Sequence, residues 1–300
     1  VIGSNNSKNG PSEPINKAYL ALKKEIEKRF SIDSKRIYSI GFSGGSRVAL
    51  RFASQEPDIF RGVIATGAFI NPDFGYKDKN IFIYGIVGDE DFNYSEYKRG
   101  PLLEKTNTPY WIEIRKGIHQ WPEKERVYEA IEMFDYWNLK NSESKGLAQA
   151  EQIIKNRMAR VEDMITKKMW VHASSEVDNL LRNFEGNPLL DKIKELRKKL
   201  DGMPEYQVDK KAESDFFEIA EKVKQPVETP EYWQAFTKIQ SISKENTRIG
   251  NLGKGTLGSL SEGIKSSYKN ISESKNIPPV QKGLYFSVAH LANPGDPRVP

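Results

Sequence analysis

The chain has 300 residues, a formal net charge of +5, 37% hydrophobic residues and no cysteine. The lack of cysteine excludes disulfides, thiol nucleophiles and zinc–thiolate sites. Neither half of the chain contains a basic block free of acidic residues, which argues against a nucleic-acid-binding surface, and no apolar run is long enough for a transmembrane helix.

Residues 1–139 alternate between helix and strand signals. Helices are predicted from Pro14 to Phe30, from the residues after Gly45 to about Pro57, and over Glu123–Asn138. Short apolar runs between them are typical of buried strands: Ile37–Ile40, Gly62–Gly67, Ile81–Val87 and Tyr110–Ile114. Short buried strands that alternate with helices indicate an α/β fold with a parallel sheet covered on both faces.

From about Lys140 onward the strand signals stop. The polar stretch 140–147 is predicted to be a linker, and 148–300 an all-α, repeat-like domain, either a small solenoid or a bundle. Glycine and proline are expected to separate its helices at 202–204, 226–230 and 250–255. The helix signals themselves are Ile154, Met158, Val161 and Ile165 at amphipathic spacing, followed by Leu189–Leu200, Phe216–Val223 and Tyr232–Ile242.

The sharpest functional signal is Gly41-Phe42-Ser43-Gly44-Gly45, which follows a predicted strand and precedes a predicted helix. In this context Gly-x-Ser-x-Gly is a nucleophile elbow, a strained turn that exposes the serine hydroxyl. So tight a turn requires small residues two positions away on either side, and the amide of Gly44 at the helix start faces a developing oxyanion. The alternative is a glycine-rich turn that binds phosphate or only packs.

A nucleophilic serine needs a general base, and the chain has three histidines. His119 lies just after the last predicted strand and just before the helix that follows, which is where the base of such a site belongs. His172 lies in a helical stretch and His290 near the end of the sequence, and both are predicted to be packing or surface residues.

The acid that orients the base is expected in Gly88-Asp89-Glu90-Asp91, directly after the strand Ile81–Val87. The spacing from Gly88 favours Asp91, and Asp89 is the alternative acid. Two other interpretations of the cluster are a solvated loop and an Asp-x-Asp metal clamp, although the sequence offers no further ligands nearby.

Taken together, these motifs resemble the α/β-hydrolase superfamily, and most of all its polyhydroxybutyrate depolymerase-like and feruloyl-esterase-like branch. The resemblance covers about residues 1–139, and it is carried by Ile32–Tyr38 leading into Gly41–Gly45, by Gly88–Asp91 and by Gly117–Pro122. It implies Ser43 as nucleophile, Asp91 as acid, His119 as base and Gly44 as one oxyanion donor. Such enzymes have more strands than the four predicted here. Their second oxyanion donor comes from a loop after an earlier strand, which the four predicted strands do not include.

The resemblance implies a serine hydrolase that acts on a small-molecule or polymer ester and needs no cofactor and no metal. Loops around the mouth of the site are expected to contact the substrate, namely those carrying Asn5, Asn6, Tyr94, Tyr97 and Trp121. Two alternatives stay open. One is a serine peptidase of the same fold, and the other is an inactive hydrolase-like scaffold whose helical domain binds a protein partner.

The chain begins Val1-Ile2-Gly3-Ser4, without methionine. We interpret it as an N-terminally truncated piece of a longer protein. Enzymes of the resembling branch are often exported, which favours an extracytoplasmic location, either periplasmic or secreted; the sequence itself leaves the compartment undetermined.

Overall fold

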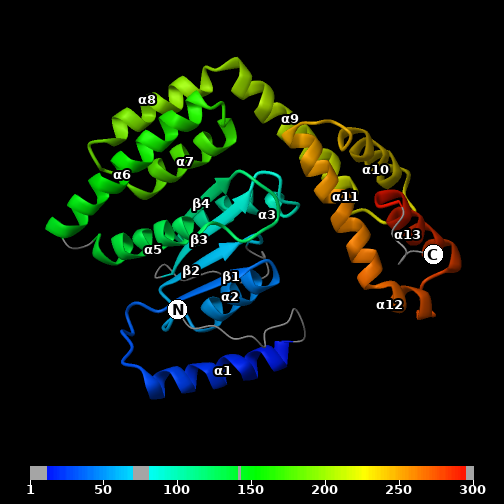
Figure 1. Cartoon of the computed structure of the whole chain (residues 1–300), viewed down its shortest axis with the longest axis horizontal. Helices are drawn as coiled ribbons and strands as arrows, with labels where there is room; N and C mark the ends of the chain where they lie inside the picture. Colours follow the sequence, from blue (N-terminus) through cyan, green and yellow to red (C-terminus); the bar gives the residue numbers. More distant parts are fainter. Residues whose placement is uncertain (1–11, 70–80, 141–142, 295–300) are drawn as a thin grey trace.

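A parallel sheet lies at the centre of the computed structural model, which describes residues 12–69, 81–140 and 143–294 (Figure 1). The sheet has four strands in the order β1-β2-β3-β4, and every neighbouring pair is parallel. This confirms the predicted parallel α/β arrangement. The strands are β1 (Tyr38–Phe42), β2 (Gly62–Thr66), β3 (Phe82–Gly88) and β4 (Tyr110–Arg115).

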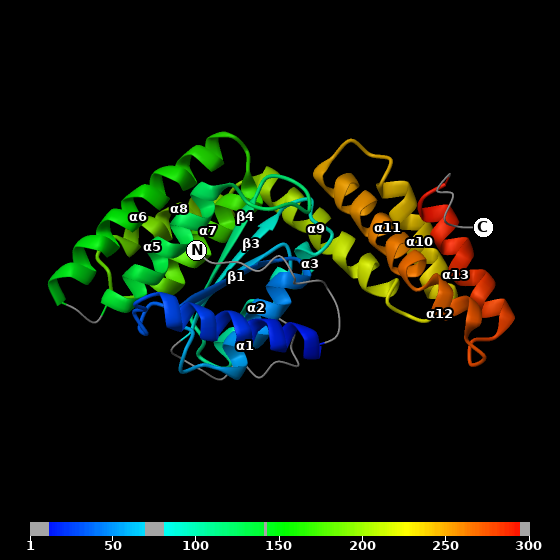
Figure 2. The same ribbon diagram turned by 60° about the horizontal axis from the view of Figure 1, so that its bottom comes forward.

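Helices cover both faces of the sheet and then continue beyond it. In Figures 1 and 2, α1 and α2 lie on one face, α5 to α8 lie on the other, and α9 leads away to α10–α13. None of the described helices is both long and apolar enough to cross a membrane. Their bounds are α1 (Ser12–Arg29), α2 (Gly44–Gln55), α3 (Tyr94–Tyr97), α4 (Pro101–Glu104), α5 (Lys124–Leu139), α6 (Glu143–Thr166), α7 (Trp170–Asn183), α8 (Leu190–Asp201), α9 (Pro204–Lys222), α10 (Pro230–Ile242), α11 (Arg248–Ser266), α12 (Tyr268–Glu273) and α13 (Pro279–Ala292).

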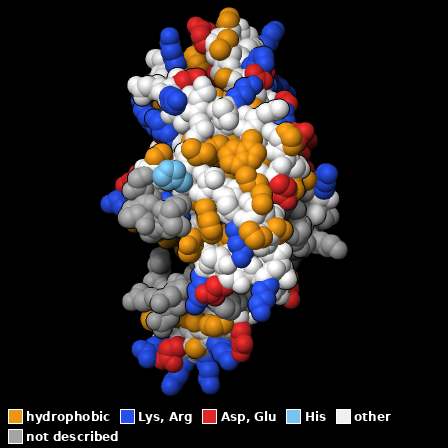
Figure 3. Space-filling view, turned by 90° about the vertical axis from the view of Figure 1, so that its right-hand side faces the viewer, with side chains coloured by type: hydrophobic (Ala, Val, Ile, Leu, Met, Phe, Trp, Pro, Cys, Tyr) orange, Lys and Arg blue, Asp and Glu red, His pale blue; other side chains and the backbone are white. Residues whose placement is uncertain are grey.

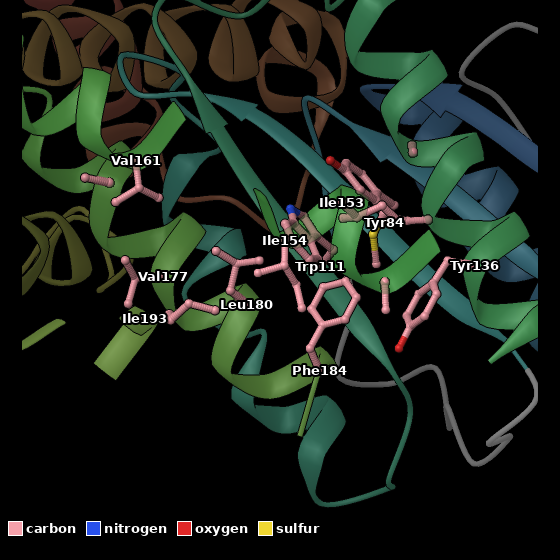
Figure 4. Packing of buried hydrophobic residues seen from close by; sticks show 14 of the residues in the cluster. Tyr84, Trp111, Tyr136, Ile153, Ile154, Val161, Val177, Leu180, Phe184 and Ile193 are labelled. Atoms are coloured by element: carbon pink, nitrogen blue, oxygen red, sulfur yellow. The ribbon is translucent and has the colours of Figure 1, made fainter. Parts of the chain in front are cut away.

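The two faces of the sheet arise from the alternation of side chains along each strand. In β3, Phe82 and Tyr84 belong to the apolar core under α5 to α8, whereas Ile83 and Val87 belong to the core on the other face. Figure 4 shows the first of these cores, where Trp111 of β4 packs among side chains from α6 and α7. All seven residues of β3 are buried, as expected for a strand covered on both sides.

The outer edge of β4 is covered by α7 through polar side chains. The amide of Ile112 donates to Asn179 Oδ1 at 3.0 Å, and the Ile112 carbonyl accepts from Ser175 Oγ at 2.7 Å and from Asn179 Nδ2 at 2.6 Å. One turn later along the helix, Asn183 Nδ2 donates to the Tyr110 carbonyl at 3.0 Å. These residues lie on one face of α7, so the helix satisfies the unpaired backbone groups of an edge strand.

The predicted linker and domain boundary do not coincide with a division of the core. Helix α6 already begins at Glu143, inside the stretch predicted to be a linker. Buried side chains of α6 to α8, such as Ile154 and Ile193, form one continuous cluster with Phe82 and Trp111 of the sheet. The first part of the helical region is therefore packed against the sheet as part of the same core.

Glycines that were expected to interrupt the chain at 250–255 instead lie inside α11. At Gly250, an added Cβ would lie 2.2 Å from the Glu245 carbonyl oxygen, and at Gly253 it would lie 3.2 Å from the Ser243 amide nitrogen. The preceding turn thus packs directly on the backbone of the helix. This close packing, together with the Thr247 N-cap, outweighs the low helix propensity of glycine.

The end of the molecule formed by α10 to α13 has an apolar cluster of its own, which includes Val227, Phe236, Ile239 and Val288. Figure 3 shows this end from outside, where hydrophobic side chains gather near the middle of the face and charged ones lie around them. The segment 279–292 is the helix α13, which the sequence analysis did not predict.

Candidate active site

Ser43 occupies a strained turn between β1 and α2. Its φ is +54° and its ψ is −121°, a backbone conformation that L-residues rarely adopt. Hydrogen bonds to the end of β2 hold the turn: the Ser43 amide donates to the Thr66 carbonyl at 2.8 Å, and Thr66 Oγ1 donates to the Gly41 carbonyl at 2.8 Å. The serine side chain therefore stands at the carboxyl end of the sheet.

The two glycines that flank Ser43 differ in what the turn requires of them. A Cβ added at Gly41 would lie 2.1 Å from the Gly45 carbonyl oxygen and 2.6 Å from the Ser46 amide nitrogen. At Gly45, an added Cβ would meet nothing within 4 Å among the described residues. The expected need for a small residue is therefore present at Gly41 and absent at Gly45.

Gly44 is the first residue of α2, so its amide has no acceptor within the helix. The positive end of the helix dipole lies at the same place. An amide of this kind is suited to an anionic oxygen atom formed next to Ser43 Oγ.

His119 lies in the loop that follows β4, and a buried arginine supports that loop. Arg115 Nη2 donates to the Gln120 carbonyl at 2.7 Å and to the Ile118 carbonyl at 3.3 Å. Gly117, which lies between Arg115 and Ile118 in the sequence, has a φ of +130°, a conformation that favours glycine. The sequence analysis missed Arg115; a charged residue at the end of a buried strand, four positions before His119, is the signal that could have indicated it.

Ser43, His119 and Asp91 meet in one hydrogen-bonded row. Ser43 Oγ lies 3.0 Å from His119 Nε2, and His119 Nδ1 lies 2.9 Å from Asp91 Oδ2 and 3.0 Å from Asp91 Oδ1. Asp91 is 1% exposed, and its Oδ1 also accepts from the Asn93 amide at 2.8 Å. Asn93 in turn donates through Nδ2 to the Gly67 carbonyl at 2.8 Å, which fixes the acid loop against the end of β2.

Asp89, the alternative acid, has other partners than His119. Its Oδ1 accepts from the Gly117 amide at 2.8 Å, and its Oδ2 lies 3.4 Å from Nε2 of His172 on α7. Burial raises the pKa of Asp89, and the hydrogen bond from Gly117 partly opposes that shift. Of the two carboxylates, the structure brings Asp91 to the histidine and places Asp89 beneath the histidine loop.

Aromatic side chains surround the His119 ring. The Phe42 ring lies 4.7 Å and the Phe92 ring 4.4 Å from it, measured between ring centroids. Trp121 stacks on Phe42 at 5.3 Å and is 55% exposed, so it lies at the surface next to the His119 site, and its contact with a substrate stays a prediction. Neighbouring Ile118 is also exposed.

The other residues expected to contact substrate lie elsewhere. Tyr94 is fully buried, and its hydroxyl donates to Glu213 Oε2 on α9 at 3.1 Å. Tyr97 is also buried, with its hydroxyl donating to the Ile86 carbonyl at 2.9 Å. Asn5 and Asn6 lie outside the described residues. Tyr94 and Tyr97 therefore pack inside the protein, because the short helix α3 turns both rings inward.

The side chains around the site support a metal centre less than they support an activated serine. Within the described ranges no group of three or more His, Asp or Glu side chains is placed to hold a metal ion.

Comparison of the chain with known proteins finds no matching family model, no matching curated protein and no matching solved structure. The interpretation of the site therefore depends on its own geometry.

Proposed function

We propose that the chain is a serine hydrolase of the α/β-hydrolase type, which cleaves a carboxylic ester through an acyl-enzyme. The single observation that carries the proposal is the continuous row of contacts from Ser43 Oγ through the His119 ring to Asp91, with gaps of 3.0 Å and 2.9 Å. Both distances allow hydrogen bonds, and the three groups have the residue types and order of a nucleophile, a base and an orienting acid.

In the proposed reaction His119 Nε2 takes the proton of Ser43 as Oγ attacks the ester carbonyl carbon. The negative charge that develops on the carbonyl oxygen is stabilised by the amide of Gly44. His119 then gives the proton to the departing alcohol, which leaves an acyl group on Ser43. Water, deprotonated by His119, attacks that acyl group and releases the acid, and Ser43 recovers its proton.

Asp91 holds the imidazole in the required tautomer, because a ring proton on Nδ1 is donated to its carboxylate while Nε2 stays free to accept from Ser43. Its burial keeps water from competing for the histidine, and the Asn93 amide fixes the orientation of the carboxylate. The strain at Ser43 supports the same assignment, since strained backbone clusters at functional sites.

The test is labelling of the full chain with a fluorophosphonate probe, which reacts with activated serines. Wild type is expected to label, Ser43→Ala to lose all labelling, and His119→Ala to label far more slowly. Ser54→Ala is the matched control, because Ser54 lies on the helix that follows Ser43 and its hydroxyl donates to the Arg51 carbonyl, three residues away. A folded wild type that does not label, or a Ser43→Ala variant that still does, would refute the proposal.

Ester and amide cleavage are separated by a matched pair of substrates that carry the same acyl group, one as a p-nitrophenyl ester and one as a p-nitroanilide. Turnover of the ester alone supports an esterase. Comparable turnover of the anilide would instead assign the same site to a peptidase.

A further inference from the structure

The loop that carries His119 is held in place by a side chain that has no role in the proposed reaction. Asp89 Oδ1 accepts the Gly117 amide at 2.8 Å, two residues before His119. The loops touch again nearby, since a Cβ added at Gly88 would lie 2.0 Å from the Gly117 carbonyl oxygen. The Glu90 amide donates to that same carbonyl at 3.1 Å. Both the donor and the acceptor of the Gly117 backbone are thus held by the acid loop.

The helical region reaches the same place through α7. His172 is 5% exposed, and its Nε2 lies 3.4 Å from Asp89 Oδ2. It is on the same face of α7 as Ser175 and Asn179, whose side chains bond to the edge of β4. Because these bonds fix the register of α7 along β4, they also fix where His172 stands at the carboxyl end of the sheet.

We propose that Asp89 and His172 are positioning residues that together set the place of the His119 loop, with the His172 imidazole in packing contact with Asp89 and no hydrogen bond between them. In this arrangement the imidazole of His172 packs behind Asp89, and Asp89 holds the Gly117 amide. The helical region is then part of the catalytic apparatus and not only an appendage. The inference rests on the proposed hydrolase function, because it assigns a role in that reaction.

The physical reason is the sensitivity of proton transfer to distance. The two hydrogen bonds of His119 need both ring nitrogens placed at once, yet the loop around Gly117 adopts a backbone conformation that glycine makes soft. A displacement of about 1 Å costs about a hundredfold in rate even when it arises away from the reacting atoms. A fixed, buried acceptor under Gly117 removes that freedom.

Asp89→Ala removes the acceptor, whereas Asp89→Asn keeps an oxygen for the Gly117 amide. We expect Asp89→Ala to lower kcat for p-nitrophenyl acetate about 10- to 100-fold with little change in KM, and Asp89→Asn to restore most of the loss. His172→Ala should act in the same direction. The double variant Asp89→Ala/His172→Ala should lose no more than Asp89→Ala alone, because the two residues act as a unit.

A second measurement does not need activity. In proton NMR, we expect the hydrogen bond between His119 Nδ1 and Asp91 to give a low-field resonance, and His119→Ala would assign it, because the sequence has three histidines. It should weaken or vanish in Asp89→Ala and persist in Asp89→Asn. Ser54→Ala is the control, since Ser54 lies near the C-terminal end of α2, outside α7 and both loops, and its hydroxyl donates to the Arg51 carbonyl.

The outcomes separate the two proposals. If wild type does not label with the fluorophosphonate, the hydrolase function fails, while the NMR comparison still decides whether Asp89 positions His119. If Asp89→Ala keeps both the resonance and the wild-type kcat, the positioning role is refuted. Equal losses in Asp89→Ala and Ser54→Ala would also refute it, because they would show a general effect on stability.

Discussion

Gly41→Ala is the sharpest test of the turn at Ser43, because Gly45→Ala provides a control within the same motif. The added methyl group at position 41 would lie 2.1 Å from the Gly45 carbonyl oxygen, 2.3 Å from its carbonyl carbon and 2.6 Å from the Ser46 nitrogen. All three are backbone atoms at the start of α2, so no side chain can rotate away. The helix or the strand has to move.

The size of the effect follows from these distances. Real Cβ atoms essentially never approach closer than 3.0 Å, so relief of the 2.1 Å contact requires a shift of about 1 Å in the turn. Overpacking of this kind costs about 3 kcal/mol of unfolding free energy, and a shift of about 1 Å at the nucleophile costs about a hundredfold in rate. In the part of the chain that the structure describes, a Cβ at position 45 has no neighbour within 4 Å, and Gly45→Ala gains helix propensity, so its stability should equal or exceed wild type by up to about 1 kcal/mol.

Urea unfolding gives the stabilities of the two variants, and the rate of fluorophosphonate labelling reports the placement of Ser43. Gly41→Ala should be less stable and label about a hundredfold more slowly, while Gly45→Ala should behave like wild type. The reasoning is refuted if both variants label at the wild-type rate with equal stability. Equal losses in both would also contradict it, because the structure assigns the close approach to Gly41 alone.

Further predictions concern stability. Burial lowers the pKa of His172 to about 4 from 6.5, so between these pH values the unfolded chain binds a proton on His172 that the folded chain does not. As the pH falls from 6.5 to 4, this difference should lower the free energy of unfolding by about 3 kcal/mol. Urea unfolding of wild type and His172→Gln measures it, and equal pH dependence in the two would contradict it. Glu113→Ala removes a buried carboxylate that accepts from Arg160 and from the Tyr84 hydroxyl, while Glu129 and Glu176 remain beside Arg157 and Arg160, and should cost about 2–3 kcal/mol. Lys211→Ala, which breaks an exposed pair with Asp215, should cost under about 1 kcal/mol; similar losses would contradict this ranking. Thr247→Ala removes the N-cap that accepts the Gly250 amide at 2.9 Å and should cost about 1 kcal/mol by thermal unfolding, while an unchanged midpoint would show that the cap is not needed.

Most of the sheet could be predicted from the sequence because β2 and β3 are buried along their whole length and β4 along most of it. Runs such as Ile81–Val87 have no polar residue to confuse them with amphipathic helices, and the observed strands start within one residue of the predicted ones. The meeting of Ser43 and His119 could also be predicted, because parallel strands bring their carboxyl ends to one edge. The order of the motifs and strands along the chain was enough to predict both the sheet and the meeting of Ser43 with His119.

What the sequence did not reveal depends on contacts between distant segments. The glycines of α11 are typical of a break, yet close packing on the turn at 243–245 keeps them helical. Tyr94 follows the acid loop and was expected at the mouth of the site, but its hydroxyl finds Glu213, 119 residues away, and turns the ring inward. The contact of Asp89 with His172 likewise joins the loop after β3 to the later helix α7, and no local pattern encodes it.

The acidic segment after β3 shows why its three carboxylates are not interchangeable. Asp89 accepts the Gly117 amide, Glu90 Oε1 accepts from Asn251 Nδ2 of α11 at 2.9 Å, and Asp91 contacts His119. Three adjacent negative charges would repel one another if they were directed to one point, and each instead has a different partner: Asp89 and Asp91 contact two residues of the loop after β4, and Glu90 contacts α11. The preference for Asp91 that the spacing from Gly88 indicated therefore has a structural reason: Asp89 is already bound to the histidine loop, and Glu90 is already bound to the helical region. An Asp91→Asn variant should for this reason not be rescued by Asp89, because Asp89 could reach His119 only by releasing the loop that carries it.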